Sequence, residues 1–385
     1  MSGSRPDLDD VREGVRAVCR PFDEPYWQAV DQSHSYPEDF VAALTDGGWL
    51  SVHVPEEYGG GGRGIAEASV VMEELNRSGA NGAACHAQMY ALWVLLRAGT
   101  EDQRSKWLPQ IAKGALRFQA FGVTEPDAGS DTPTITTRAV RHDDHYVING
   151  QKVFTSRVQH SDLLLLLART TPLEEVARRT DGMTLFLVDL RDSEDAIRAE
   201  PIRTMVNHET NALFIDDLRV PMEARVGEEG SGFYHLLDAL NAERILIASE
   251  CVGDGRWFID RSVAYANQRV VFGRAIGSNQ GVQFPLAHAH MDIEAADAIR
   301  WRAVETFDAG GPTGALANMA KYLASEAAIA AGDAAMTTFG GWGMTVEYGI
   351  ERKFRETRLY RVAPITNNLV LGYVGQHVLG LPKSY

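Results

Sequence analysis

The spacing of hydrophobic residues along the chain changes twice. From about residue 6 to residue 114, apolar side chains recur every three or four positions, which predicts helices. From about 118 to 221 they form short runs separated by Asn, Asp and Gly, which predicts strands. From Gly232 onward the helical spacing returns, with an alanine-rich stretch at 315–335. The pattern predicts an α+β protein in three parts: a helical domain at 1–117, a β domain at 118–226 and a second helical domain at 227–385.

Three short segments add detail to this pattern. The aliphatic run at 163–167 predicts a buried strand and is far too short to span a membrane. Asn149 followed by Gly150 is typical of a two-residue β-hairpin turn, so we expect a turn there. The four consecutive glycines at 59–62 predict a flexible connector within the first helical region.

Composition and charge exclude several classes of partner. The chain has 385 residues, a net charge of −15 and no basic cluster, which excludes nucleic acid and anionic membranes. A negatively charged ligand must therefore be met by a few arginines or by backbone amides. The three cysteines (Cys19, Cys85 and Cys251) are too few and too scattered for a disulfide framework, which fits a reducing compartment. Without a long apolar segment, we expect a cytoplasmic protein with no membrane insertion.

The loop at 121–131 holds the densest chemistry in the chain. A predicted strand at 119–123 ends in a turn in which Pro126 fixes one backbone angle and Gly129 permits a positive φ. Thr124 and Ser130 are thereby held at defined positions. Such a turn offers hydrogen bonds to the edge of a polar planar ligand and to a phosphate.

Three further stretches offer complementary groups. In the segment 151–156, Phe154 offers a flat face beside two hydroxyl residues, which suits the isoalloxazine ring of a flavin. In the segment 269–280, Gly273 is expected to end a helix and Gln280 to begin the next, with Arg269 and Gln280 gripping a pyrophosphate and Phe272 as an apolar shelf. The segment 339–343 is a glycine cluster in which backbone can approach a ligand closely.

Together and in this order, the four stretches resemble the acyl-CoA dehydrogenase family of flavoenzymes. The resemblance implies an N-terminal helical domain, a middle β-barrel or sandwich domain, a C-terminal four-helix bundle and assembly as a dimer of dimers. It also implies FAD-dependent α,β-dehydrogenation of an acyl-CoA thioester to the trans-2-enoyl-CoA, with an electron-transfer flavoprotein as acceptor. The implied contacts to the FAD ring and ribityl chain are Phe121, Val123, Thr124, Gly129, Ser130, Phe154, Thr155 and Ser156.

The resemblance extends to positions near the C-terminus. Arg269, Phe272, Gln280, Gly340 and Gly341 would reach an FAD bound mainly by a neighbouring subunit. Thr337 replaces the Gln usual in the family, so the cofactor contact implied at that position departs from the pattern. The further implied residues are Thr366 and Asn368 toward the cofactor, and Ser130, Asn241 and Arg244 toward the substrate.

The position of the catalytic base is a second departure from the family. Many members carry a Glu where this chain has Pro364, and proline cannot act as a base. On the helix predicted from near Ser231, an apolar stripe of Phe233, Leu236, Leu237, Leu240 and Ile247 is interrupted by Glu243. A buried carboxylate is costly unless it is paired or used. Glu243 is therefore either an ion-pair partner of Arg244 or Arg269, or the base, as in the family branches that carry it in a D-x-E-R segment, where this chain has Asn241 in place of the Asp.

Two other functions remain open at this point. A flavin-dependent monooxygenase or oxidase on the same fold needs no α-proton base, and Pro364 is compatible with it. A flavin-binding protein that acts only as a subunit of a larger complex is a third reading. Ala363, in place of a bulkier residue common in the family, suggests more room over the pocket but does not name the acyl chain. His288 and His290 are two positions apart and leave a helix on different faces, so we expect no zinc site there.

Overall fold

The computed structural model describes residues 8–193 and 195–383 of the chain. These residues form two compact units. The first comprises the chain up to Ser33, Arg63–Gly82 and everything from Glu243 onward, and the second comprises His34–Gly62 and Ala83–Ala242. The division falls within one long helix, α7 (Gly232–Gln268).

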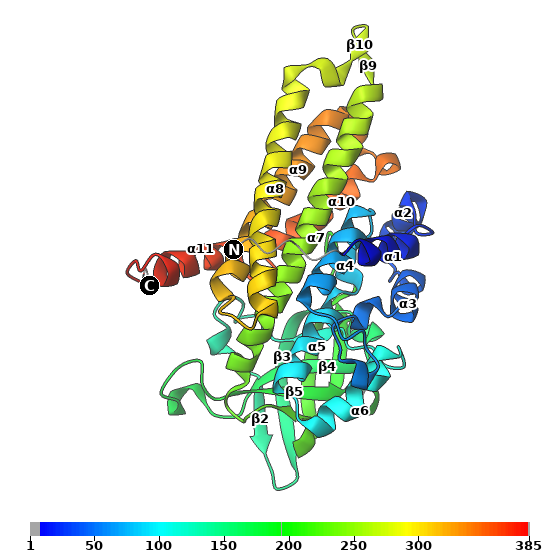
Figure 1. Cartoon of the computed structure of the whole chain (residues 1–385). Helices are drawn as coiled ribbons and strands as arrows, with labels where there is room; N and C mark the ends of the chain where they lie inside the picture. Colours follow the sequence, from blue (N-terminus) through cyan, green and yellow to red (C-terminus); the bar gives the residue numbers. More distant parts are fainter. Residues whose placement is uncertain (1–7, 194, 384–385) are drawn as a thin grey trace. The chain divides into compact units, whose positions relative to one another are not determined.

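The first unit is helical, as the spacing of apolar residues predicts. Its long helices are the part of α7 after residue 242, α8 and α9, and Figure 1 shows them as an extended bundle. A two-stranded hairpin, β9 and β10, joins α7 to α8 at one tip of this bundle (Figure 1). Besides this part of α7, the helices and strands of the unit are α1 (Asp9–Cys19), α2 (Glu24–Ser33), α4 (Ile65–Arg77), β9 (Val270–Val271), β10 (Arg274–Ala275), α8 (Gln280–Asp308), α9 (Gly314–Phe339), α10 (Ile350–Arg358) and α11 (Asn367–Tyr373).

A buried ionic network joins four helices of this unit. Glu73 of α4 is fully buried and lies 2.7 Å from Arg300 of α8, 2.5 Å from Arg256 of α7 and 3.0 Å from Arg12 of α1. Burial alone raises the pKa of Glu73, but these cations together lower it well below its usual range. Arg256 also pairs with Asp297 of α8 over 3.0 Å. Removing one member of such a buried network leaves its partners uncompensated, which makes the network a strong constraint on how these helices pack.

Among the residues that the structure describes, the second unit contains one sheet, three complete helices and the first part of α7. The strands follow the order β6-β7-β3-β2-β4-β5-β8, and β1 pairs with β4 beside this path. The β1–β4 and β2–β4 pairs are parallel and the others are antiparallel. The elements are α3 (Glu38–Asp46), α5 (His86–Ala98), α6 (Glu101–Ala112), β1 (Ala120–Gly122), β2 (Arg138–Arg141), β3 (His145–Ser156), β4 (Leu163–Arg169), β5 (Met183–Asp189), β6 (Ile197–Pro201), β7 (Thr210–Pro221) and β8 (Arg225–Val226).

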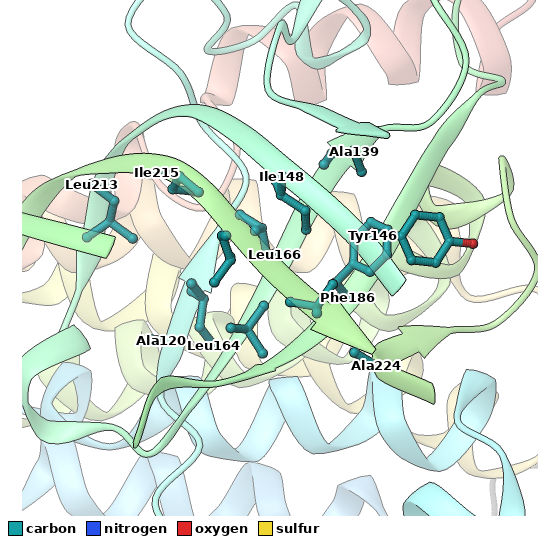
Figure 2. Packing of buried hydrophobic residues seen from close by; sticks show 14 of the residues in the cluster. Ala120, Ala139, Tyr146, Ile148, Leu164, Leu166, Phe186, Leu213, Ile215 and Ala224 are labelled. Carbon is teal, nitrogen blue, oxygen red and sulfur yellow. The ribbon is translucent and has the colours of Figure 1, made fainter. Parts of the chain in front are cut away.

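The hydrophobic core of this unit lies on one face of the sheet. Figure 2 shows Leu164 and Leu166 of β4 among Tyr146, Ile148 and Phe186 from neighbouring strands. The alternate residues of β4 point to the opposite face and are buried as well, so the whole strand is inaccessible. A strand that is covered on both faces reads as a continuous apolar run, which confirms the buried strand predicted at 163–167. The helix–strand–helix order of an α+β protein is likewise confirmed.

The hairpin turn expected at Asn149 and Gly150 is wrong. Both residues lie inside β3, where the pairing with β7 shifts register between Ile148 and Gly150. A Cβ at Gly150 would lie 2.5 Å from the Oγ1 of Thr137, so glycine is required there by a close approach between strands. The turn between β2 and β3 is instead closed by the hydrogen bond from the His142 N–H to the His145 carbonyl.

The flexible connector expected at 59–62 is also wrong. The N–H of Gly61 donates to the Ser51 carbonyl over 3.2 Å, and that of Gly62 donates to the Val54 carbonyl over 2.8 Å. A Cβ at Gly60 would lie 2.3 Å from the carbonyl oxygen of Val54. The glycines are present because this turn packs directly on the preceding backbone, not because the segment needs freedom.

Candidate functional site

The loop after β1 forms a closed turn with an exposed tip. Glu125 and Ala128 exchange backbone hydrogen bonds of 3.2 and 3.1 Å, which fixes the turn between them. Gly129 and Ser130 follow and are exposed, and a Cβ at Gly129 would meet no atom within 4 Å. Thr124 is half-buried on the other side of the turn. The loop therefore presents small groups and backbone amides to the outside, as the sequence predicts.

The second loop is the end of β3, where the strand departs from regular pairing. The register with β7 shifts between Lys152 and Thr155, and Phe154 takes a φ of 58° with 62 % of its surface exposed. A positive φ is unfavourable for an aromatic residue, and exposure of its ring is costly as well. These two features at one residue are typical of a side chain held in position for a ligand. Thr155 next to it is fully buried, and Ser156 is half-buried.

The two loops lie side by side within the second unit. The N–H of Val153 donates to the carbonyl of Thr124 over 2.9 Å, and the Nζ of Lys152 donates to the carbonyl of Val123 over 3.1 Å. Phe121 lies on the same strand end and packs edge-on against Tyr90 of α5, with ring centroids 5.9 Å apart. The structure thus brings together the first two of the four stretches that the sequence singles out.

The third stretch is a hairpin, not a helix end. α7 ends at Gln268, and Phe272 and Gly273 form the turn between β9 and β10 with φ values of 51° and 77°. Two consecutive positive φ values are those of a type I′ turn, which explains Gly273 and corrects its predicted role as a helix terminator. Phe272 at the tip is fully exposed. Arg269 and Gln280 are exposed as well. Gln280 is the first residue of α8, as predicted.

The fourth stretch follows α9 and lies next to the third. α9 ends at Phe339, and Gly340 takes a φ of 61°, which glycine adopts without strain. The Phe339 ring stacks on Tyr265 of α7 at 4.1 Å, and the Tyr265 carbonyl accepts from the N–H of Arg269 over 2.8 Å. Gly340, Gly341 and Thr337 are all exposed at this end of the bundle.

Glu243 of α7 is buried, as its place in the apolar stripe predicts. It is 3 % exposed and Arg244 is 6 % exposed, whereas Leu237 of the predicted stripe is largely exposed at 37 %. Burial lowers the pKa of Arg244, and the negative charge of Glu243 opposes this shift. Asn241, two residues before Glu243 on the same helix, is half-buried.

Arg269 is excluded as the ion-pair partner of Glu243 within one chain. Gln268 ends α7 and lies 25 residues after Glu243, which corresponds to about 38 Å of helix. Of the two pairings that the sequence left open, only the one with Arg244 is compatible with this separation.

A buried lysine anchors the segment that contains Pro364. The Nζ of Lys321 on α9 donates to the carbonyl of Ile365 over 2.8 Å and to the Oδ1 of Asn367 over 2.7 Å. Thr366 caps α11 by accepting from the N–H of Leu369, and Asn368 is exposed. Burial lowers the pKa of Lys321 to about 8, with Glu243 and Arg244 among the charges that act on it. Lys321 and Thr337 are separated by about 24 Å along α9, so Thr366 and Asn368 do not join the glycine turn.

The groups present fit an FAD cofactor. Among the described residues, the Oγ1 of Thr155 is buried and has no hydrogen-bond partner. A buried hydroxyl without a partner is costly, and a ligand that hydrogen-bonds to it removes that cost. The exposed ring of Phe154 and the open backbone at Gly129, both in the second unit, are the other features that such a ligand needs.

Two ion-pairing residues near these stretches escaped the sequence analysis. Lys152 belongs to the second stretch and Glu125 to the first, yet neither was assigned a role. Hydrophobic spacing marks apolar positions only, so it gave no signal that these two charged side chains are buried. The buried Lys321 was missed for the same reason.

Neither a cluster of metal-binding side chains nor a membrane-spanning helix is found in the part of the chain that the structure describes. Residues 8–193 and 195–383 hold no group of three or more His, Cys, Asp or Glu side chains arranged for a metal ion. Within the same residues, none of the helices has both the length and the apolar character that are needed to cross a bilayer. The three cysteines are all buried.

Comparisons with known proteins match nearly the whole length of the chain. Family models for the N-terminal, middle and C-terminal domains of acyl-CoA dehydrogenase match residues 5–115, 120–218 and 230–379. Acyl-CoA dehydrogenase FadE12 of Mycobacterium tuberculosis is 37% identical over 388 residues, covering 97% of this chain and 96% of that protein.

Solved structures give the same result for the fold. The chain is similar to glutaryl-coenzyme A dehydrogenase in complex with glutaryl-CoA, with a TM-score of 0.92, 27% identity and coverage of 100% of this chain and 98% of that one. It is also similar to a chain in the structure of the electron transferring flavoprotein of Acidaminococcus fermentans, with a TM-score of 0.91, 27% identity and coverage of 98% and 99%.

Proposed function

Since this chain belongs to the acyl-CoA dehydrogenase family and is an FAD-dependent oxidoreductase acting on acyl-CoA, we propose that it converts an acyl-CoA thioester to the trans-2-enoyl-CoA with Glu243 as the base. The single observation that carries the role of Glu243 is its place on the buried side of α7 in a chain that has Pro364 where many relatives carry their base. Dehydrogenation requires removal of the proton next to the thioester carbonyl, which a proline cannot perform.

Glu243 takes the α-proton on its carboxylate. FAD, when bound, supplies the acceptor for the hydride from the β carbon. Arg244 keeps a compensating positive charge beside the carboxylate, because arginine remains protonated even when burial lowers its pKa. Together with Asn241 and Ser130, Arg244 holds the substrate. The buried surroundings of Glu243 keep bulk water away from the acidic carbon.

The two loops of the second unit hold the flavin ring and the ribityl chain. Phe154 supplies the stacking wall, and the partnerless hydroxyl of Thr155 supplies a hydrogen bond. The remaining contacts from these loops are Phe121, Val123, Thr124, Gly129, Ser130 and Ser156. Thr366 and Asn368 contact the cofactor from the start of α11.

The hairpin and the glycine turn contact the FAD of a neighbouring subunit. Phe272 and Gly340 lie at the end of the bundle to which α7 runs, and the last residue of α7 is about 38 Å along the helix from Glu243. One cofactor cannot serve both ends of this bundle, which supports a homo-oligomer, arranged as a dimer of dimers. The contacts to the neighbouring cofactor are Arg269, Phe272, Gln280, Thr337, Gly340 and Gly341.

The proposal includes three domains, an acceptor and a location. The domain bounds 1–117, 118–226 and 227–385 are supported by the residues that the three family models match. The chain is similar to a chain in the structure of an electron transferring flavoprotein, which supports such a protein as the acceptor of electrons from this chain. The three buried cysteines support a reducing, cytoplasmic environment.

Anaerobic titration tests the reaction. Purified protein with bound FAD is mixed with a panel of acyl-CoAs of different length and branching, and the visible flavin absorbance is followed. The proposal expects at least one acyl-CoA to bleach the flavin and to yield the enoyl-CoA in equal amount. If oxygen is consumed only with an external reductant and no acyl-CoA bleaches the flavin, a monooxygenase or oxidase is the better assignment, as Pro364 allows.

A further inference from the structure

A buried ion pair connects the two flavin-facing loops of the second unit. Glu125 is 4 % exposed and Lys152 is fully buried, and the Nζ of Lys152 lies 2.9 Å from the Oε1 of Glu125. Glu125 belongs to the turn after β1, and Lys152 belongs to β3 just before its irregular end. The pair therefore bridges two segments that are 27 residues apart in the sequence.

The carboxylate of Glu125 accepts hydrogen bonds from four donors, one of which is the lysine. Its Oε2 accepts from the N–H and the hydroxyl of Thr136 over 2.6 and 2.8 Å, and its Oε1 accepts from the N–H of Thr137 over 2.9 Å and from Lys152. Burial alone raises the pKa of Glu125, but Lys152 and these hydrogen bonds lower it to about 2. The side chain is thus a fixed anion that anchors the turn on the start of β2.

The lysine makes a second contact on the same turn. Its Nζ donates to the carbonyl of Val123 over 3.1 Å, and the next residue, Val153, donates its N–H to the carbonyl of Thr124 over 2.9 Å. One side chain and one amide of β3 therefore hold three consecutive residues of the first loop. Two residues after the lysine, Phe154 takes its positive φ within β3, where the pairing with β7 shifts register.

We propose that Lys152 and Glu125 are positioning residues for FAD, which hold the loops at 121–131 and 151–156 at the separation that the flavin ring requires. The inference rests on the proposed role of these loops in holding the cofactor. Neither side chain is accessible enough to touch a ligand, so the pair acts through Thr124 on one side and Phe154 and Thr155 on the other. A network of buried charges with several fixed donors is rigid, and rigidity of this kind is what holds a binding site at its productive geometry.

The pair is tested by Lys152→Met, which keeps most of the length of the side chain and removes its charge. Glu125 retains its donors from Thr136 and Thr137 in this variant, so the sheet itself is expected to fold. Apoprotein is titrated with FAD, and visible circular dichroism of the flavin is recorded at saturation. We expect roughly 10- to 100-fold weaker FAD binding and an altered flavin spectrum at saturation, since hydrogen bonds from a charged donor are lost beneath the loops.

Glu125→Gln and the double variant complete the test. If the two residues act as one unit, the double variant binds FAD about as weakly as Lys152→Met alone. Glu125→Gln retains Lys152 and provides the same readouts if Lys152→Met does not fold. Val188→Ala is the control, because it truncates a core side chain of the same sheet on neither loop. It is expected to lower the Tm and to leave FAD affinity and the saturated flavin spectrum unchanged.

The outcomes distinguish this inference from the proposed function. If Lys152→Met keeps the FAD affinity and the flavin spectrum of the wild type, the positioning role is wrong. The role is also wrong if Val188→Ala loses as much FAD affinity as Lys152→Met when the two variants have the same Tm. Phe154→Ala decides which proposal has failed. If Phe154→Ala weakens FAD binding while Lys152→Met does not, only the positioning role is wrong. If neither variant changes FAD binding, the assignment of both loops to the cofactor is wrong.

Discussion

The Nζ of Lys321 on α9 donates a 2.7 Å hydrogen bond to the side-chain Oδ1 of Asn367, the first residue of α11. The same ammonium binds the carbonyl of Ile365, so one buried cation fixes the segment that includes Pro364. The resemblance places the base of many family members in this segment. In this chain the segment is held by a neighbouring helix and has Pro364 at that position, which supports the proposed role of Glu243 on α7.

Lys321→Met is expected to destabilise the first unit. Both acceptors lose a charged donor in a buried place, which costs about 2–3 kcal/mol of unfolding free energy. Urea unfolding measures the loss, and hydrogen exchange is expected to accelerate at the start of α11. Lys113→Met, at an exposed position, is the control and should leave both unchanged. Exchange that accelerates equally in all helices would contradict a local anchoring role.

Thr155→Val is expected to separate protein stability from cofactor binding. Among the described residues the buried Oγ1 of Thr155 has no partner, so replacing the hydroxyl by a methyl group should leave the apoprotein as stable as before or slightly more stable. FAD affinity should fall by about 5- to 10-fold, because one hydrogen bond to the cofactor is lost. Fluorescence titration of apoprotein with FAD measures the affinity. Unchanged affinity would show that this hydroxyl does not contact the cofactor.

Phe272→Gly tests the contribution of the hairpin to a neighbouring subunit. Glycine adopts the φ of 51° without strain, and the phenyl ring is fully exposed within its own chain, so the substitution removes no internal contact. We expect the variant to fold normally, to assemble less stably and to release FAD more readily. Light scattering and FAD titration measure the two effects. A variant that keeps both the assembly state and the FAD affinity of the wild type would sink the proposed role of the hairpin.

Asp254 of α7 predicts a dependence of stability on pH. Burial, with Glu356 and Glu250 nearby, raises its pKa to about 7 despite the adjacent Lys353. A carboxyl whose pKa is raised on folding favours the folded state most below about pH 4, and this advantage is lost as the pH rises through about 7. Asp254→Asn does not titrate. Its unfolding free energy relative to wild type should therefore increase by roughly 2–4 kcal/mol from pH 4 to pH 7.

Unfolding in urea at several pH values measures this difference. Loss of the partner of Lys353 shifts the unfolding free energy of the variant by the same amount at every pH. The informative quantity is therefore the slope of the unfolding free energy against pH. Asp260→Asn, at an exposed position of the same helix, should run parallel to the wild type. A difference between Asp254→Asn and wild type that stays constant with pH would mean that Asp254 remains ionised in the folded protein.

The order of helices and strands was predictable because hydrophobic spacing reports it directly. The buried strand at 163–167 and the burial of Glu243 follow from that same spacing. Glycines were less informative, because the same residue is found at turns, at positive φ and where a neighbouring segment approaches closely. The sequence does not distinguish these three causes. Gly150 was therefore assigned to a turn although Thr137 requires it, and Gly273 to a helix end although it belongs to a hairpin.

The ion pair of Lys152 and Glu125 could not be predicted from spacing. Its members come from the turn after β1 and from β3, and only the tertiary fold brings them within 2.9 Å. Charged residues are exposed in most contexts, so sequence alone assigns them to the surface. Contacts that depend on tertiary pairing carry no local signal, and this is the part of the site for which the structure was needed.

The central claim is tested most directly by the rate at which acyl-CoA reduces the bound flavin in Glu243→Gln. The variant is nearly isosteric and removes only the base, so FAD binding should be retained while anaerobic flavin reduction, followed by stopped flow, slows by about 10²–10⁴-fold. Glu250→Gln is the matched control, since Glu250 is a fully buried carboxylate of the same helix that accepts from Tyr360 over 3.1 Å. Its reduction rate should stay near that of the wild type. Flavin reduction at the wild-type rate in Glu243→Gln would contradict the account and leave Glu243 as a structural partner of Arg244.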